Sequence, residues 1–325
     1  MIHLRIVAPE ERAERVAELL LASPAVLNVV HLHEAAEKPR GDLILCDVAR
    51  EEASIVIDDL RELGIARQGS IAIEAIDTEI SDAAEKAEAA ARGLPSDAVI
   101  WEEVEERTTE DAELSGSFLA FMVLAMLIGA VGIMLDSPIL IVGAMVVGPE
   151  FGPLAGVCVS LIQKRRDLAR RSFVALAVGF PLGIAITFLV ALGLKVGGLS
   201  PAGFPSGERP LTDFISHPDF FSFLVAFLAG TAGMLSLTSA KSGALIGVLI
   251  SVTTIPAAAN VGVAAAFGDW GESQGALLQL LVNLTSIVLA GLGTLAVQRQ
   301  LFEVRRRRHK GAPRARLPAR ATRWP

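Results

Sequence analysis

Six long apolar stretches in the second part of the chain constrain its fold more than any other feature. Each has about the length that a helix needs to cross a hydrocarbon core of ~30 Å. They cover residues 118–135, 138–162, 172–196, 220–237, 242–267 and 276–297. A chain with this pattern cannot fold around a single water-exposed core, so we expect six transmembrane helices in a domain that covers residues 117–298.

Basic residues indicate how these helices are oriented. Lys and Arg gather at 164–171 between the second and third stretches, at Lys241 between the fourth and fifth, and at 299–308 after the sixth. If the helices alternate in direction, all three positions lie on one side of the membrane. The positive-inside rule then predicts that both termini are cytoplasmic. We expect a multi-pass protein of the bacterial inner (cell) membrane, with the lipid bilayer as a partner.

The front of the chain has a different composition. Residues 1–113 hold 27 Asp and Glu against 11 Lys and Arg, whereas residues 114–325 hold 9 against 18. An acidic front of this kind repels phosphates and argues against a nucleic-acid partner. Strand-like patterns at 2–8, 26–33, 42–49 and 69–80 alternate with helical patterns at 10–22 and 51–63. This order predicts an α+β protein whose cytoplasmic domain, residues 1–81, has the ferredoxin-like βαββαβ fold.

Two polar segments flank the membrane half. Residues 82–116 are expected to form an acidic helical linker, which either is solvated, docks on the basic segment 164–171 or the basic tail, or gathers cations at a pore mouth. Residues 299–325 are rich in Arg, Pro and Ala and are predicted to be a basic, disordered cytoplasmic tail that is attracted to anionic lipids.

Proline and glycine interrupt two of the apolar stretches. The second contains Gly148, Pro149, Glu150, Gly152 and Pro153, and the fifth contains Thr253, Thr254, Pro256 and Asn260. Prolines remove backbone donors, and carbonyls freed at membrane depth need protein or water to satisfy them. We expect these residues, together with Asn283 in the sixth stretch, to line a path for a substrate or ion. The alternative for the two threonines is that their hydroxyls only repair their own helix.

Glu150 is the most informative residue of this set. A carboxylate within an apolar stretch is costly and usually faces a cavity or a partner. The alternative is that Glu150 reaches the water near the cytoplasmic end of its helix. The distance along an ideal helix from Glu150 to Ile162, about 18 Å, disfavours this alternative. Gln279 and Asn283 are the candidate partners of Glu150, and Asp136 is expected to be a plain turn residue.

Small residues recur every fourth position through the first break, at Ala144, Gly148, Gly152 and Gly156. Such a stripe allows another helix to approach closely. The helix that approaches belongs either to this chain or to another subunit, and we interpret the stripe as a packing surface rather than a ligand site.

The six stretches also resemble one another in two groups of three. A segment at 129–137 is similar to one at 230–238, and both groups run as a helix, a broken helix and a third helix. Inverted repeats with broken helices are a recurring plan of secondary transporters, in which the binding site lies near the membrane midplane. We therefore predict a 3+3 inverted repeat.

In the front domain, His31 and His33 lie two positions apart on a strand and face the same way. We expect a partly solvated strand face there rather than a metal site, and nothing in the sequence predicts a cofactor. The chain shows no Ser/His pattern and no zinc motif, so we do not expect an enzyme.

Three segments carry a resemblance to a known family. They are residues 141–153, 229–238 and 247–257, and Asn283 fits the same pattern. The chain resembles the membrane family catalogued as domain of unknown function 389 over about residues 95–300. Many relatives carry an apolar residue at the position of Glu150 and a second proline at that of Ala257. The resemblance therefore implies the architecture and leaves the chemistry of Glu150 open.

These observations favour a transporter or channel for a small polar or ionic solute, assembled as a homo-oligomer. The cytoplasmic domain would bind a small ligand or gate the path. The alternative is a membrane-anchored sensor or scaffold, whose helices oligomerise the cytoplasmic domain without transport.

Overall fold

A computed structural model of the chain describes residues 1–76, 78–91, 98–201, 204, 211–239 and 254–311. The chain divides into two compact units. The first unit comprises Met1–Glu102, Thr238–Ala240 and Leu301–Pro325, and the second comprises Glu103–Leu237 and Lys241–Gln300.

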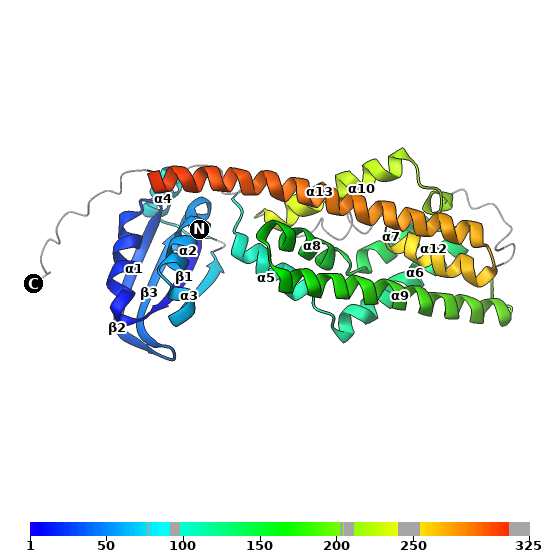
Figure 1. Cartoon of the computed structure of the whole chain (residues 1–325), viewed down its shortest axis with the longest axis horizontal. Coiled ribbons are helices and arrows are strands. Elements are labelled where there is room, and N and C mark those ends of the chain that lie inside the picture. Colours follow the sequence, from blue (N-terminus) through cyan, green and yellow to red (C-terminus); the bar gives the residue numbers. More distant parts are fainter. Residues whose placement is uncertain (77, 92–97, 202–203, 205–210, 240–253, 312–325) are drawn as a thin grey trace, which may run out of the picture. The chain divides into compact units, whose positions relative to one another are not determined.

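The first unit is built on a four-stranded antiparallel sheet with the strand order β2-β3-β1-β4 (Figure 1). The strands are β1 (Ile2–Ala8), β2 (Val26–Glu37), β3 (Arg40–Val48) and β4 (Ser70–Ala75). The helices of this unit are α1 (Glu10–Ala22), α2 (Arg50–Glu62), α3 (Ile65–Gln68) and α4 (Asp82–Ala90). The predicted alternation of strands and helices is therefore present, with one short additional helix, α3.

Alternation along the strands forms the core of this unit. Ile2, Leu4 and Ile6 of β1 are buried, whereas the residues between them are at least partly exposed. They pack with Ile44 of β3 and Leu60 of α2 in one apolar cluster. One face of the sheet is thus covered by helices, as the period-2 pattern of its strands requires.

The first unit extends beyond the boundary at residue 81 that the sequence suggests. Ser81 caps the start of α4, because its hydroxyl oxygen accepts a hydrogen bond from the amide of Ala83 at 3.1 Å. Helix α4 buries Ala84 and Ala87. Ile100 is fully buried in the core of the sheet unit. The segment after residue 81 therefore packs as part of this unit, because its alanine face and Ile100 supply apolar surface that is removed from water.

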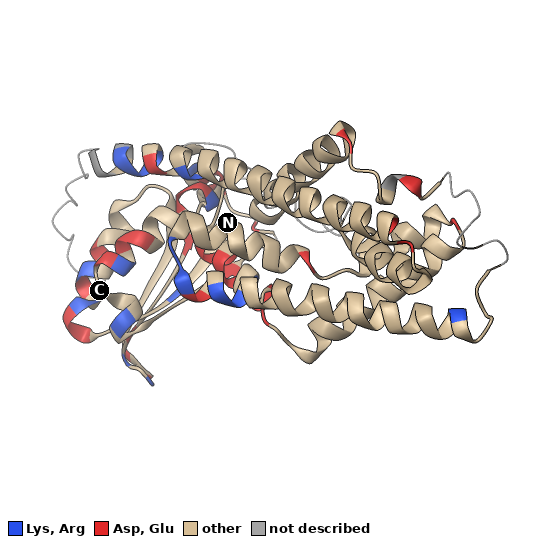
Figure 2. Cartoon of the chain, turned by 45° about the vertical axis from the view of Figure 1, so that its right-hand side comes forward, with Lys and Arg blue, Asp and Glu red and all other residues tan. Residues whose placement is uncertain are grey.

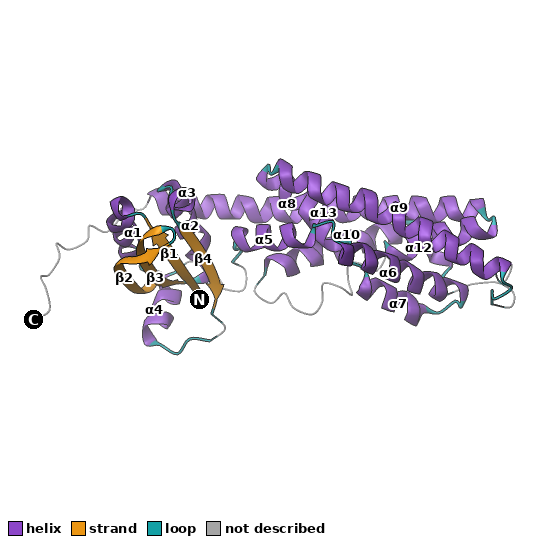
Figure 3. Ribbon diagram, turned by 90° about the horizontal axis from the view of Figure 1, so that it is seen from below, coloured by secondary structure: helices purple, strands orange, loops and turns teal. Residues whose placement is uncertain are grey.

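The second unit is helical (Figure 3). It holds all or most of α5 (Trp101–Asp111), α6 (Gly116–Met134), α7 (Pro138–Val147), α8 (Phe151–Gln163), α9 (Arg166–Val196), η2 (Asp213–Ile215), α10 (Phe220–Thr238), α12 (Ile255–Phe267) and α13 (Trp270–Gly311). Helix α12 is buried on nearly every side and contacts α9 and α6. The small side chain of Ala259 and the lack of one at Gly262 allow this close packing, since a Cβ at Gly262 would lie 2.8 Å from the carbonyl oxygen of Ile184.

Within the described residues, four helices are long and apolar enough to cross a membrane, namely α6, α9, α10 and α13. The bent pair α7 and α8 can form a fifth span, and α12 is a shorter apolar helix. Several membrane-crossing helices are thus present, as the sequence predicts. The first part of the fifth predicted stretch lies in residues 240–253, outside the described residues, so the number six stays a prediction.

The surface of the helical unit is suited to lipid. Large apolar side chains such as Ile139, Phe173 and Leu189 are exposed by 83%, 67% and 62%. Charged residues are dense on the sheet unit and sparse along α6 to α12 (Figure 2). An apolar surface this extensive is normal in contact with hydrocarbon and would be an aggregation hazard in water.

Helix α13 continues further than the sequence suggests. The tail expected to be disordered from residue 299 is helical as far as Gly311, and residues 312–325 lie outside the described part. Within the first unit, Arg306 pairs with Asp58 at 3.0 Å and with Glu62 at 2.9 Å, both on α2. Acidic partners on α2 thus offset the repulsion within the basic end of α13.

Candidate functional site

The first predicted break is a true interruption between two helices. Helix α7 ends at Val147 and α8 begins at Phe151, with a bend of 50° between them. Gly148 has extended backbone angles, φ −65° and ψ 127°, because a residue before proline avoids the helical region. Pro153 lies in the first turn of α8, where an amide has no partner within the helix. Only Pro149 therefore interrupts the helical hydrogen bonds, rather than both prolines.

Glu150 stands at the start of α8 and is completely buried. Its side chain makes no capping bond to its own helix. Oε1 instead accepts a hydrogen bond from the hydroxyl of Thr254. Oε2 is also buried and has no hydrogen-bond partner among the described residues. The alternative in which Glu150 reaches water by itself does not hold in this structure.

The second predicted break lies against the first. Thr254 immediately precedes α12, and Pro256 lies in the first turn of that helix. A Cβ added at Gly148 would lie 2.7 Å from Cγ1 of Ile255, which is fully buried. The starts of α8 and α12 therefore meet around the carboxylate of Glu150. Thr253, which the sequence places in the same site, lies outside the described residues.

The predicted amide residues make other contacts. Nδ2 of Asn260 donates to Oε1 of Glu272 at 3.0 Å, and Nε2 of Gln279 donates to Oδ1 of Asn283 at 3.1 Å. The partner of Oε1 of Glu150 is thus Thr254 rather than either residue expected from the sequence. Oδ1 of Asn260 and Oε1 of Gln279 are buried without a hydrogen-bond partner in the described part of the chain. The helical unit therefore holds two more buried oxygens that can accept a hydrogen bond.

The small-residue stripe packs against helices of the same chain. A Cβ at Gly152 would lie 3.0 Å from the carbonyl oxygen of Asp111, and one at Gly156 would lie 3.4 Å from Cβ of Ala112. Ala144 lies 3.6 Å from the position of a Cβ on Gly129 of α6. Of the two neighbours considered for this stripe, the structure shows the intramolecular one.

The acidic linker helix docks on the basic segment that follows α8. Glu105 of α5 forms an ion pair with Arg165, whose guanidinium also lies 3.0 Å from Oδ2 of Asp167. These residues all belong to the helical unit. One of the three roles considered for the acidic helix, docking on residues 164–171, is therefore present in the structure.

The sequence undervalues Asp136. This residue lies between α6 and α7 with a left-handed backbone, φ 46°. Its carboxylate accepts hydrogen bonds from the hydroxyl of Thr212 at 2.8 Å and from the amide of Leu211 at 3.4 Å. Asp136 thus ties the turn after α6 to the loop between α9 and α10. The local sequence indicates only a turn residue, because the partners of Asp136 are 75 or more positions away.

Comparison with known proteins bears on this geometry. Residues 145–289 match the family model described as Domain of unknown function (DUF389). Both predicted breaks lie within the matched segment. This match confirms the resemblance expected from the sequence. It begins within α7, contains Glu150 and Thr254, and ends within α13.

The chain is also 26% identical over 194 residues to Uncharacterized protein MJ0678 of Methanocaldococcus jannaschii. The aligned part is 60% of this chain and 58% of that protein, so the chain spans less than two thirds of the relative's length. No solved structure matches the chain. The comparisons therefore supply a family and no activity.

Proposed function

We propose that this protein is a transporter or channel for a small polar or ionic solute, and that the solute passes the junction between the starts of α8 and α12. The observation that carries the proposal is the buried carboxylate of Glu150, whose Oε2 has no hydrogen-bond partner among the described residues. A charged group held in this way at membrane depth is expensive, and such groups usually mark ion paths, proton relays or substrate sites.

The junction offers chemistry suited to a charged or polar guest. The first amides of a helix point out of its start and carry a partial positive charge. Two such starts lie together here, with the carboxylate of Glu150 and the hydroxyl of Thr254 between them. A proton or a cation can neutralise the carboxylate, whereas the carboxylate would repel a solute that carries its own negative charge.

The arrangement of helices supports the same reading. The first half of the membrane region contains the apolar helix α6, the interrupted pair α7 and α8, and the apolar helix α9, and the second half contains α10, α12 and α13 in the described residues. We propose that these halves form a 3+3 inverted repeat with six membrane crossings. Sites of transporters with this plan lie where the two interrupted helices meet.

We propose a regulatory role for the sheet unit. Its strand order, β2-β3-β1-β4, supports the ferredoxin-like assignment. Residues 301–311 of α13 belong to this unit, and Arg306 pairs with Asp58 and Glu62 there. The same helix contributes Asn283 to the membrane region, so α13 is a covalent element through which ligand binding can bias the path.

Localisation and assembly complete the proposal. The basic loops support a bacterial inner membrane protein with both termini in the cytoplasm, and we propose that the chain forms a homo-oligomer. No catalytic reaction is assigned to it. The second candidate function is a membrane-anchored sensor or scaffold without transport, which the ion pairs between α13 and α2 favour equally.

Flux across liposomes tests the proposal. The full chain is reconstituted into vesicles that contain a pH-sensitive dye, and uptake of H⁺ is measured under a K⁺ diffusion potential, followed by Na⁺ and Cl⁻ in separate experiments. We expect flux of at least one of these ions above that of empty vesicles, and a change of tenfold or more in Glu150→Gln. Glu110→Gln is the matched control, because Glu110 is exposed on α5.

Equal flux in the parent and in Glu150→Gln would remove Glu150 from the mechanism. A second experiment separates the two candidate functions. Cysteines are placed at Val147 and Ile255 in a chain that lacks Cys46 and Cys158, and a water-soluble thiol reagent is added. A transporter requires a hydrated junction and reactive cysteines there, whereas unreactive cysteines together with absent flux would favour the scaffold.

A further inference from the structure

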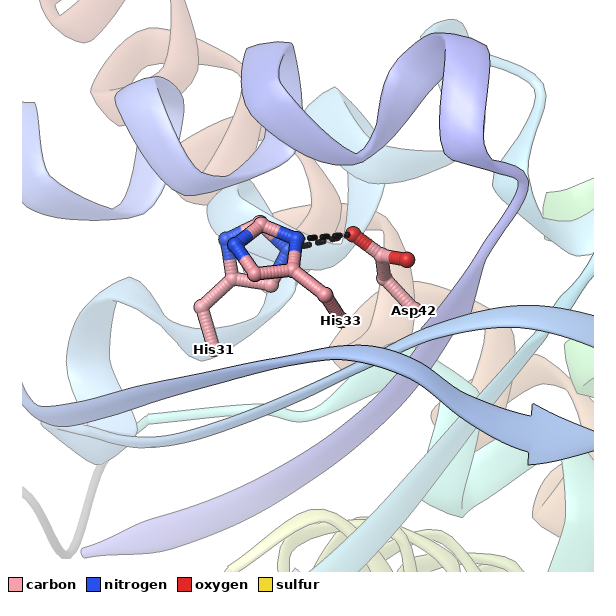
Figure 4. Close-up of side chains that lie close together, drawn as sticks. All are labelled: His31, His33 and Asp42. Atoms are coloured by element: carbon pink, nitrogen blue, oxygen red, sulfur yellow. Dashed lines mark hydrogen bonds and ion pairs between the residues drawn. The ribbon is translucent and has the colours of Figure 1, made fainter.

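A cluster of metal-binding side chains lies in the sheet unit, remote in sequence from the junction. His31 and His33 on β2 and Asp42 on β3 each direct one ligand atom to the same point (Figure 4). Nε2 of His31 lies 2.7 Å from Oδ2 of Asp42, and Nδ1 of His33 lies 3.0 Å from the same oxygen. All three ligand atoms lie within 4.8 Å of one another.

Strand pairing explains why the three residues meet. His31 pairs with Ile44 and Asp42 pairs with Ala8, both of which belong to the core face of the sheet. A shift of register follows between Leu32 and Ala36. Such a bulge re-aims the side chains beside it. His33 lies beside His31, with the ring centroids 4.2 Å apart, because residues two apart on a strand face the same side.

The carboxylate is held in place from its other side. The amide of Glu34 donates to Oδ1 of Asp42 at 2.9 Å, leaving Oδ2 for the two imidazoles. Glu34 itself has a left-handed backbone, φ 50°, a conformation uncommon for a residue with a Cβ. Hydrogen bonds to the oxygen of a ligating carboxylate that does not bind the metal are typical of the surroundings of metal sites.

We propose that His31, His33 and Asp42 bind one divalent transition-metal ion of the zinc class. Two imidazole nitrogens and one carboxylate oxygen are ligands that Zn²⁺ accepts at about 2.0–2.2 Å, and such ligands stand ~3.4 Å apart around a tetrahedral ion. The observed separations of 2.7 and 3.0 Å are about 0.7 and 0.4 Å shorter than that value, so the side chains need to move apart by less than an ångström to admit the ion.

Exposure leaves room for a fourth ligand. The side chain of Asp42 is 4% exposed and that of His31 is 16% exposed, whereas that of His33 is 73% exposed. The ion would thus have one face toward the protein and one toward water, which fits a site that loads and unloads reversibly. A regulatory role of this ion in the sheet unit rests on the proposed function. The metal site itself does not rest on it.

Cobalt binding to the full chain tests the site. The protein is purified in detergent without a polyhistidine tag, stripped with a chelator and titrated with Co²⁺, whose visible absorption is intense only when nitrogen and oxygen ligands hold it in a four- or five-coordinate site. We expect one Co²⁺ per chain and its displacement by one equivalent of Zn²⁺. In His33→Ala the affinity should fall at least tenfold, and this variant leaves the fold intact because His33 is exposed.

A matched control is available in the same sheet. Nδ1 of His3 lies 2.6 Å from Oδ1 of Asp47, and no second imidazole joins this pair among the described residues. His3→Ala should therefore bind Co²⁺ like the parent. Equal affinity in the parent and in His33→Ala, or Co²⁺ bound without visible absorption, would overturn the proposal. Because no flux is measured, failure of the transport proposal does not affect this result.

A last comparison addresses regulation. If Co²⁺ binds as expected, ion flux into the vesicles is measured with Zn²⁺ and with chelator, in the parent and in His33→Ala. A regulatory site requires a change of flux in the parent alone. The same flux under both conditions would leave the metal site established and remove its regulatory role.

Discussion

The hydroxyl of Thr254 donates a hydrogen bond to Oε1 of Glu150, although the two residues lie 104 positions apart in the chain. Both are fully buried, and each stands at the start of a helix, Glu150 before α8 and Thr254 before α12. This contact joins the two breaks and is the basis of the first prediction.

Removing the hydroxyl should destabilise the helical unit. Thr254→Val keeps the shape of the side chain and leaves Oε1 of Glu150 without its donor. Leaving a buried polar group unsatisfied costs about 1–3 kcal/mol. We expect a lower midpoint of thermal unfolding in detergent, and Thr254→Ser, which keeps the hydroxyl, should remain close to the parent. Equal midpoints for the valine and serine variants would contradict a structural role for this bond.

The close approach of the two breaks predicts the effect of a methyl group at Gly148. In Gly148→Ala the new Cβ would meet Cγ1 of Ile255 at 2.7 Å and would also crowd Oε2 of Glu150. Overpacking of this kind costs about 1–3 kcal/mol. Gly143→Ala, within the preceding helix α7, is the control, because a Cβ there meets nothing within 4 Å. Thermal unfolding should separate the two variants, and equal loss in both would show that the junction has room to spare.

The bond between Asp136 and Thr212 should be measurable as a coupling free energy. Asp136→Gly removes the carboxylate and still suits the left-handed backbone at this position, φ 46°. Thr212→Val should cost about 1 kcal/mol in the parent and clearly less in the Asp136→Gly chain, since the acceptor is then already absent. Additive losses in the double variant would mean that the 2.8 Å contact contributes nothing to stability.

The stability of the sheet unit should depend on the protonation of Glu102. Burial raises the pKa of this carboxyl, and the nearby Arg61 and the hydroxyl of Ser54 offset the increase only in part, so its pKa lies above the ordinary value. The folded state therefore holds the proton more tightly than the unfolded state. This contribution to stability is present below the unfolded pKa of about 4.3 and is lost as the pH rises through the folded pKa.

Glu102→Gln, whose side chain is neutral at every pH, isolates this effect. We expect the difference in unfolding free energy, parent minus variant, to fall as the pH is raised from 4 to 7. The full chain in detergent is unfolded thermally at several pH values, with the two proteins compared at each. A difference that stays constant, or that grows with pH, would contradict the direction of the shift.

Local sequence patterns predicted much of the framework for identifiable reasons. The alternation of Ile2, Leu4 and Ile6 places β1 with one face toward the core. The apolar stretches are long enough and apolar enough to cross a membrane. Pro149 and Pro256 mark the breaks because proline restricts its own backbone and that of the residue before it. These are properties of neighbouring residues, so they are readable without knowing the fold.

The partners of the polar residues were not readable in this way. The sequence offered Gln279 and Asn283 for Glu150, and packing chose Thr254. It placed His31 and His33 on one face of a strand, and only the pairing of β2 with β3 and its bulge added Asp42. The sequence by itself therefore determined where the chain is apolar, where its helices break and how strands and helices alternate. Tertiary structure decided which buried polar atoms meet, because contacts between distant segments depend on how whole helices and strands pack rather than on the preferences of single residues.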